Sequence, residues 1–128
     1  MVRIFLASIV FLLLPLPSAL ADSATPSYVE LHDAPAITVD WSKGDTQAVT
    51  IHGNRRLVFS NGQKGGKYIL VIKQDATGSR LVTWPASVRW PGGSPQAFIL
   101  TTTANSKDFI GFIYDGEKYD AVSISQNF

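Results

Sequence analysis

The sequence predicts an all-β protein, an antiparallel β-sandwich of the jelly-roll kind with about eight short strands and no substantial helix after an N-terminal signal segment. Three observations favour this fold. Short apolar segments recur along the chain, with turn signals at the close spacing that is typical of sandwiches and barrels. Residues able to adopt positive φ or to begin a tight turn occupy the breaks. No segment after the signal shows the i, i+3, i+4, i+7 apolar spacing of an amphipathic helix.

Residues 1–21 have the organisation of a secretory signal peptide. A basic residue, Arg3, precedes an apolar run over residues 4–14, and two prolines end that run. Small residues follow at the positions that a signal peptidase reads, so we expect cleavage between Ala21 and Asp22 and a secreted or periplasmic protein. The run is shorter than the about 20 residues of a membrane-spanning helix. We therefore expect no membrane span after cleavage.

The composition narrows the class of protein. The chain has 11 basic and 10 acidic residues, and loss of Arg3 with the signal leaves a neutral protein. Nucleic-acid binding requires clustered Lys and Arg, so no nucleic-acid partner is expected. Cysteine is absent, and a small exported domain without disulfides depends on its core or on partner subunits.

The segments follow one another in a simple order. Residues 22–35 form a lead-in that contains two prolines, and residues 36–128 form the sandwich domain. The breaks include Gly53-Asn54 and Asn61-Gly62, which favour turns. Strands are expected at Ala36–Asp40, Gln47–His52, Arg56–Ser60, Lys67–Gln74, Arg80–Trp84, Ala97–Thr102, Phe109–Tyr114 and Tyr119–Ser125.

The last two of these strands form a predicted hairpin. Asp115-Gly116 between apolar runs is a strong hairpin signal, and Tyr114 then stands opposite Glu117 or Tyr119, depending on loop length. In both alternatives the hairpin is apolar on both of its sides, and the same holds for the strand Lys67–Gln74. A half-solvated antiparallel strand would instead alternate apolar and polar residues. We therefore expect a homo-oligomer packed through the outer side of one sheet, with an interface that includes Phe109, Ile113, Val122 and Ile124.

Several motifs carry a family resemblance. Gln74-Asp, Gly78-Ser-Arg, Thr-Trp84-Pro and Trp90-Pro-Gly-Gly93 follow one another within the central stretch, and Phe112-x-Tyr114-Asp-Gly-x-x-Tyr119 and a closing Asn127-Phe128 come after it. Over about residues 36–128 the chain resembles the C-terminal β domain of bacteriophage tail-fibre and virion-appendage proteins. Asp75-Ala76 departs from the Asp-Gly that often follows the glutamine, and a signal peptide is foreign to that family.

The resemblance implies a structural or adhesive role rather than an enzymatic one. It implies assembly through oligomerisation, with a trimer favoured, and binding to a glycan or another cell-surface receptor. The prediction is thus an exported, non-enzymatic module. The alternative is a monomeric secreted carbohydrate-binding protein that uses exposed aromatic rings.

The aromatic residues allow two interpretations. Prolines follow Trp84 and Trp90 directly and hold both residues in extended conformations. The rings could plug the end of the sandwich, because buried aromatic side chains dominate core energetics. In the other interpretation they form an exposed sugar-binding platform, with Trp41, Trp84, Trp90 and Tyr119 as the ligand-binding candidates.

No pattern points to catalysis, a metal or a cofactor. His32 and His52 are the two histidines, and no Gly-x-Ser-x-Gly elbow accompanies them. An H-E-x-x-H helix and thiolates are also absent from the sequence. We therefore expect no catalytic residue, no metal site and no cofactor.

Overall fold

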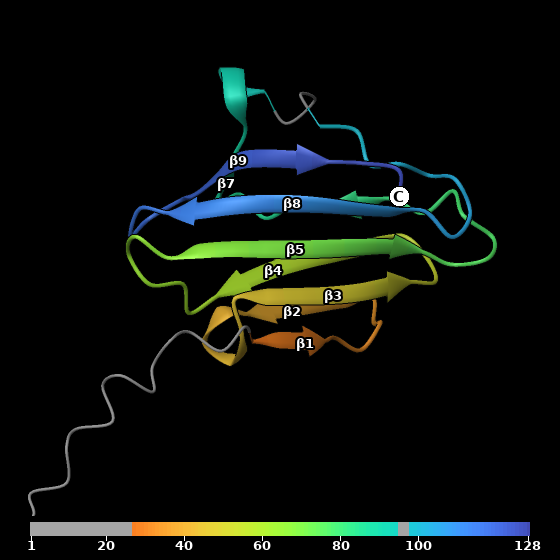
Figure 1. The fold of residues 1–128 in the computed structure, drawn as a ribbon, viewed down its shortest axis with the longest axis horizontal. Coiled ribbons are helices and arrows are strands. Elements are labelled where there is room, and N and C mark those ends of the chain that lie inside the picture. The colour runs from red at the N-terminus through yellow and green to blue at the C-terminus, as the bar shows by residue number, and fades with distance from the viewer. Residues whose placement is uncertain (1–26, 95–97) are drawn as a thin grey trace, which may run out of the picture.

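The computed structural model describes residues 27–94 and 98–128, so the predicted signal peptide and its cleavage site lie outside the described residues. The described residues form nine strands in two sheets that pack face to face (Figure 1), which confirms the all-β sandwich. The strands are β1 (Tyr28–Glu30), β2 (Ala36–Asp40), β3 (Thr46–Ile51), β4 (Arg55–Ser60), β5 (Lys67–Gln74), β6 (Val82–Thr83), β7 (Val88–Arg89), β8 (Lys107–Tyr114) and β9 (Tyr119–Ser125).

The first six strands form a parallel coil. The chain alternates between the sheets, so β1, β3 and β5 lie side by side in the six-stranded sheet and β2, β4 and β6 make the three-stranded sheet. Every pairing within these two sets is parallel. Parallel neighbours need a long crossover, and here each crossover runs through a strand of the opposite sheet.

The antiparallel jelly-roll arrangement predicted from the sequence is therefore wrong for this part of the chain. Gly53-Asn54, for example, lies between β3 in one sheet and β4 in the other. Turn residues show that the backbone bends, but they do not show which sheet the next strand joins. The same residue types serve a hairpin and a corner between sheets.

The larger sheet also contains antiparallel pairs. Strands β5, β8 and β9 are antiparallel neighbours in that order, whereas short β7 joins the far edge of β9 in parallel. The hairpin between β8 and β9 places Tyr114 opposite Tyr119, so the four-residue alternative is the correct one. The Asp115 carboxylate accepts hydrogen bonds from the backbone N–H groups of Glu117 and Lys118 at 2.8 and 2.7 Å, which fixes the loop.

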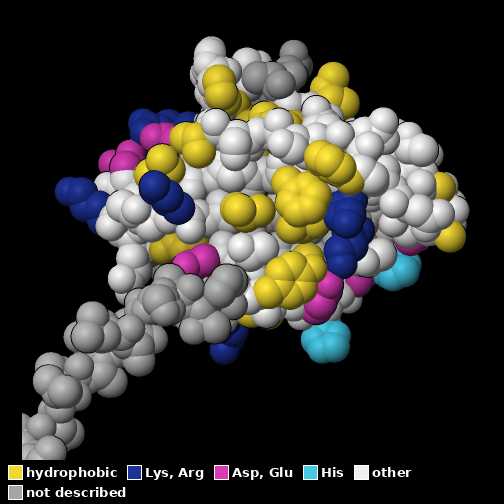
Figure 2. All heavy atoms as spheres, viewed as in Figure 1, with side chains coloured by type: hydrophobic (Ala, Val, Ile, Leu, Met, Phe, Trp, Pro, Cys, Tyr) yellow, Lys and Arg dark blue, Asp and Glu magenta, His cyan; other side chains and the backbone are white. Residues whose placement is uncertain are grey.

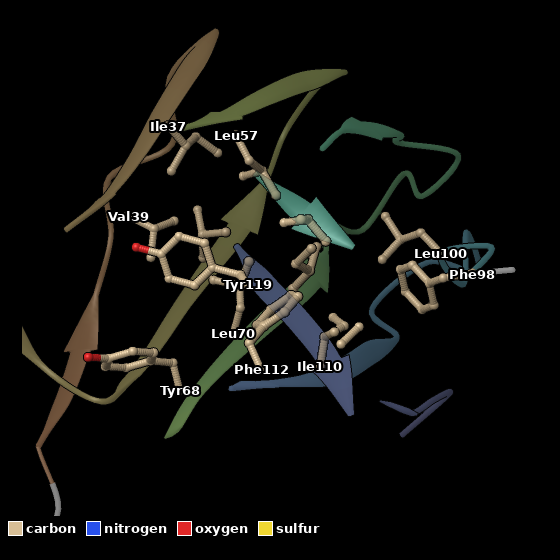
Figure 3. Close-up of a cluster of buried hydrophobic side chains, with 14 of the residues drawn as sticks. Ile37, Val39, Leu57, Tyr68, Leu70, Phe98, Leu100, Ile110, Phe112 and Tyr119 are labelled. Carbon is tan, nitrogen blue, oxygen red and sulfur yellow. The ribbon is translucent and has the colours of Figure 1, made fainter. Parts of the chain in front are cut away.

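The core lies between the two sheets. Ile37, Val39 and Leu57 of the smaller sheet face Leu70, Ile110 and Phe112 of the larger one (Figure 3), and all six are at most 2% exposed. Phe98 and Leu100, from the segment before β8, close one end of this core. Burial of such side chains supplies most of the favourable free energy of folding.

Three predicted strands differ from β3, β4 and β8 by one or two residues at their ends, two others differ more, and two short strands were not predicted. Arg80–Trp84 contributes only β6, and residues 98–102, the described part of Ala97–Thr102, belong to neither sheet. Alternating apolar residues there cover the end of the core without a backbone ladder. Strand β1 lies inside the expected lead-in and β7 between the two Trp-Pro pairs.

No helix among the described residues reaches the length and apolarity that crossing a membrane requires.

Candidate interaction surface

The outer face of the six-stranded sheet carries exposed apolar side chains. Successive residues of a strand point to opposite sides, so residues next to core positions in β5 and β8 point outward. Ile69 of β5 is 42% exposed and Ile113 of β8 is 36% exposed. Figure 2 views this side of the molecule and shows apolar side chains spread across the sheet among few charged ones. Contiguous exposed apolar surface is typical of interaction sites.

A β-bulge shapes the middle of this face. The pairing of β8 with β9 shifts by one residue between Gly111 and Phe112, which leaves Val122 as the extra residue on β9. Ser123 stands opposite Gly111, where a Cβ atom would collide with the Ser123 hydroxyl oxygen. Glycine inside a strand often marks a bulge or a close approach by another group. A side chain at position 111 would therefore force the Ser123 hydroxyl to turn away.

A hollow opens in the face beside Gly111 and Ser123. Its volume is about 480 Å³, and small residues meet larger apolar ones around it. We call it the sheet-face hollow. Its lining includes the apolar residues Ile69, Ile113 and Val122, the small residues Gly111 and Ser123, and two charged residues, Asp45 and Lys67.

The four predicted interface residues do not all share this face. Ile113 and Val122 are exposed and line the hollow. Phe109 is half-buried, with the ring of Phe128 edge-on at 5.5 Å between centroids. Ile124 pairs across the ladder with Ile110, a core residue, so it lies on the inner side of the sheet. The bulge reverses the alternation beyond Val122, which is why a regular pattern misplaces Ile124.

A cluster of three polar side chains borders the face at β1. The Lys73 ammonium contacts the Glu30 carboxylate at 2.8 Å, and the Tyr28 hydroxyl donates to the same carboxylate oxygen at 2.9 Å. The hydrogen bond from Lys73 lowers the pKa of Glu30 below its usual value. The carboxylate is therefore ionised at neutral pH and balanced by Lys73, so this border adds no net charge to the face.

The candidate sugar-binding aromatics lie mostly in the core. Trp41, Trp90 and Tyr119 are 2%, 7% and 4% exposed, and Trp84 is half-buried. The Tyr119 hydroxyl accepts a hydrogen bond from the Gly62 backbone at 3.0 Å, and burial raises the pKa of Tyr119. A stacking platform needs an open ring face. The burial of these rings supports their interpretation as core plugs.

A groove nevertheless opens beside two of these rings. Its volume is about 620 Å³, and Trp84, Trp90 and Ala121 form apolar parts of its lining. Arg89 and Asp120 also line it and pair at 2.6 Å. The groove thus combines apolar surface with one ion pair.

Charged residues elsewhere tie corners of the coil together. Arg55 pairs with Asp33 at 2.6 Å, and Arg80 pairs with Asp75 at 3.1 Å. The Arg80 hydrogen bond lowers the pKa of Asp75 to about 2. His52 Nδ1 lies 3.4 Å from the Asp75 carboxylate. Within residues 27–94 and 98–128, no three His, Cys, Asp or Glu side chains gather closely enough to hold a metal ion.

Leu81 and Ile99 are prominent surface residues that the sequence reasoning did not single out. They are 53% and 77% exposed and border an apolar groove of about 650 Å³ beside β6. Both lie in segments expected to be regular strands, where one side of the strand is ordinarily solvated. The consecutive apolar residues Phe98-Ile99-Leu100 were the available signal, because one of three such residues must point outward.

Comparison with known families identifies a match over most of the described residues. The family model described as "Putative phage tail fibre C-terminal domain" matches residues 34–119. The match runs from before β2 to the first residue of β9, so it includes the whole three-stranded sheet and the six-stranded sheet apart from β1 and most of β9. No curated protein matches the chain.

Proposed function

Because the chain belongs to the phage tail fibre C-terminal domain family, we propose that it is an exported structural module that associates with copies of itself and binds a cell-surface receptor. The role is structural and adhesive rather than catalytic. A trimer is the stoichiometry that the family resemblance favours. Residues 1–21 direct export, and cleavage between Ala21 and Asp22 releases the neutral mature protein.

The exposed apolar outer face is the observation that carries the proposal. Ile69, Ile113 and Val122 are exposed around one hollow on the six-stranded sheet. Asp45 and Lys67 are the charged residues beside the hollow, and the Glu30 carboxylate at the border of the face is paired with Lys73. Apolar surface of this kind is removed from water when another copy covers it, at about 25 cal/mol per Å².

The mass of residues 22–128 in solution tests the proposal. We expect light scattering across a concentration series to give a stable closed oligomer for the wild-type chain. A monomer at every concentration up to the solubility limit would overturn the assembly proposal. Mass spectrometry of the exported protein tests the cleavage site, and an N-terminus other than Asp22 would contradict it.

A charge on the face locates the interface. Val122→Glu should weaken association by roughly a hundredfold, because burial of an unpaired charge costs about 3 kcal/mol or more. Thr38→Glu is the matched control, since Thr38 is exposed on β2 of the other sheet. If the two variants associate equally well, the outer face of the six-stranded sheet is not the interface.

Carbohydrate binding at the groove beside Trp84 and Trp90 is a second candidate function. The half-buried ring of Trp84 and the Arg89–Asp120 pair would offer apolar contact and hydrogen bonds to one sugar ring. A glycan array with residues 22–128 should then give a signal that Arg89→Ala and Trp84→Phe reduce. A signal that both variants leave unchanged would exclude this groove.

A further inference from the structure

A second apolar surface lies away from the outer sheet face. Leu81 and Ile99 border the groove beside β6, and Val82 of that strand belongs to the three-stranded sheet. We call Leu81 and Ile99 the flank patch. The sheet-face hollow opens on the outer side of the other sheet. One copy therefore cannot place its own flank patch in its own hollow.

Ile99 is held as a fixed protrusion. Phe98 and Leu100 on either side of it are buried in the core, at 6% and 7% exposure, whereas Ile99 is 77% exposed. The Ile99 carbonyl accepts a hydrogen bond from Gln126 Nε2 at 2.6 Å. The backbone at Ile99 is therefore held on both sides, so it loses little conformational freedom when a partner covers the side chain, which reduces the cost of association.

The sheet-face hollow is shaped to receive such a protrusion. Gly111 and the small Ser123 form part of its lining, and Ile69, Ile113 and Val122 provide apolar contact around it. The volume of about 480 Å³ exceeds that of one aliphatic side chain, so neighbouring residues of the flank patch can enter with it. Two flat faces pressed together would leave this hollow unfilled, and unfilled volume forfeits packing energy.

We propose that copies of this chain associate head to tail, with Ile99 of one copy seated in the sheet-face hollow of the next. The inference rests on the proposed self-association and specifies its geometry. A contact between two different surfaces is heterologous, so it produces a closed ring when the rotation closes and a filament when it does not. An isologous dimer built from two sheet faces would leave the flank patch exposed.

Two variants that each damage one surface test this geometry. Val122→Glu places a charge beside the hollow, and Ile99→Glu places one on the flank patch. Each variant alone should be monomeric at concentrations where the wild type is oligomeric. An equimolar mixture should form a one-to-one dimer of twice the monomer mass, because one variant retains the flank patch and the other retains the hollow.

The controls separate this inference from the proposed function. Thr38→Glu adds the same charge on exposed β2 of the three-stranded sheet, outside the groove that the flank patch borders, and should assemble as the wild type does. An oligomeric wild type together with an Ile99→Glu variant that still assembles would overturn the head-to-tail geometry alone. A monomeric wild type would overturn both proposals.

Folding failure does not obscure the result. Dimer formation in the mixture requires both variants to be folded, and near-ultraviolet circular dichroism of each variant checks this directly. If Ile99→Glu does not fold, Ile99→Ser replaces it and should weaken association at least tenfold. Two folded variants that stay monomeric when mixed would refute the proposal.

Discussion

Replacement of the buried Asp108 carboxylate should loosen the segment that carries Ile99. Asp108 is 1% exposed and accepts hydrogen bonds from Thr101 N at 2.7 Å, Asn127 N at 3.0 Å and Gln126 Nε2 at 3.2 Å. It thereby ties the segment before β8 to the C-terminal residues. Asp108→Ala removes the acceptor from all three donors, and a donor left without a partner in a buried place costs about 1–3 kcal/mol.

The loss of the carboxylate does not cost the same free energy at each of the three donors. Thr101 is half-buried, whereas Gln126 and Asn127 are exposed and can turn to water. We therefore expect Asp108→Ala to lower the free energy of unfolding by about 2–4 kcal/mol. Asp108→Asn keeps the shape but replaces one acceptor oxygen with an NH₂ group that faces a donor, so its loss should be about 1–2 kcal/mol.

Urea unfolding followed by tryptophan fluorescence measures both losses, since the tryptophans lie in or against the core. Hydrogen exchange provides a local readout, in which the Thr101 and Asn127 amides should exchange faster in both variants while those of β5 do not. An Asp108→Ala protein within about 0.5 kcal/mol of the wild type, the range of an ordinary surface substitution, would refute the reasoning.

Three further predictions concern stability. The folded-state pKa of Asp75, about 2, lies below the usual value near 3.9, so the ionised carboxylate stabilises the fold above about pH 4 and this stabilisation is lost as pH falls towards 2. Acid unfolding of Arg80→Met should therefore show a shallower loss of stability over that pH window. An unchanged profile would contradict the assignment to Arg80. Gly111→Ala should cost about 1–3 kcal/mol through its clash with the Ser123 hydroxyl, and the double variant with Ser123→Ala should recover part of it; additive losses in urea unfolding would disprove the clash. Leu70→Ala, at a fully buried core position, should cost about 2–5 kcal/mol by thermal and urea unfolding, and a loss under about 1 kcal/mol would show that the core tolerates the cavity.

The sequence predicts the class of fold because its local signals are strong. Strands β2, β5 and β9 have the predicted bounds, and the Asp115-Gly116 turn forms the predicted hairpin. The family is also readable from the sequence, since its motifs follow one another along the continuous stretch from Gly66 to Gly93. Each of these inferences uses residues that are close together in the chain.

The pairing of strands that are distant in the chain is harder to predict from the sequence. Strand β3 lies between β1 and β5, and both neighbours are parallel to it. Those partners are separated from β3 by strands of the other sheet, so short-range turn chemistry cannot indicate them. The bulge at Val122 is similar, because it depends on the fit between Gly111 and Ser123, which belong to different strands.

The two-sided apolar pattern of Lys67–Gln74 has two physical origins. On the outer side of β5, Val71 is only 2% exposed whereas Ile69 is 42% exposed. One outward residue is thus already covered within the fold, and the other lies beside the sheet-face hollow. The part of the face that gains from a partner is therefore confined to the region of the bulge. A partner that fills it must present a protruding apolar side chain rather than a flat sheet, and among the described residues Ile99 is the most exposed large apolar side chain.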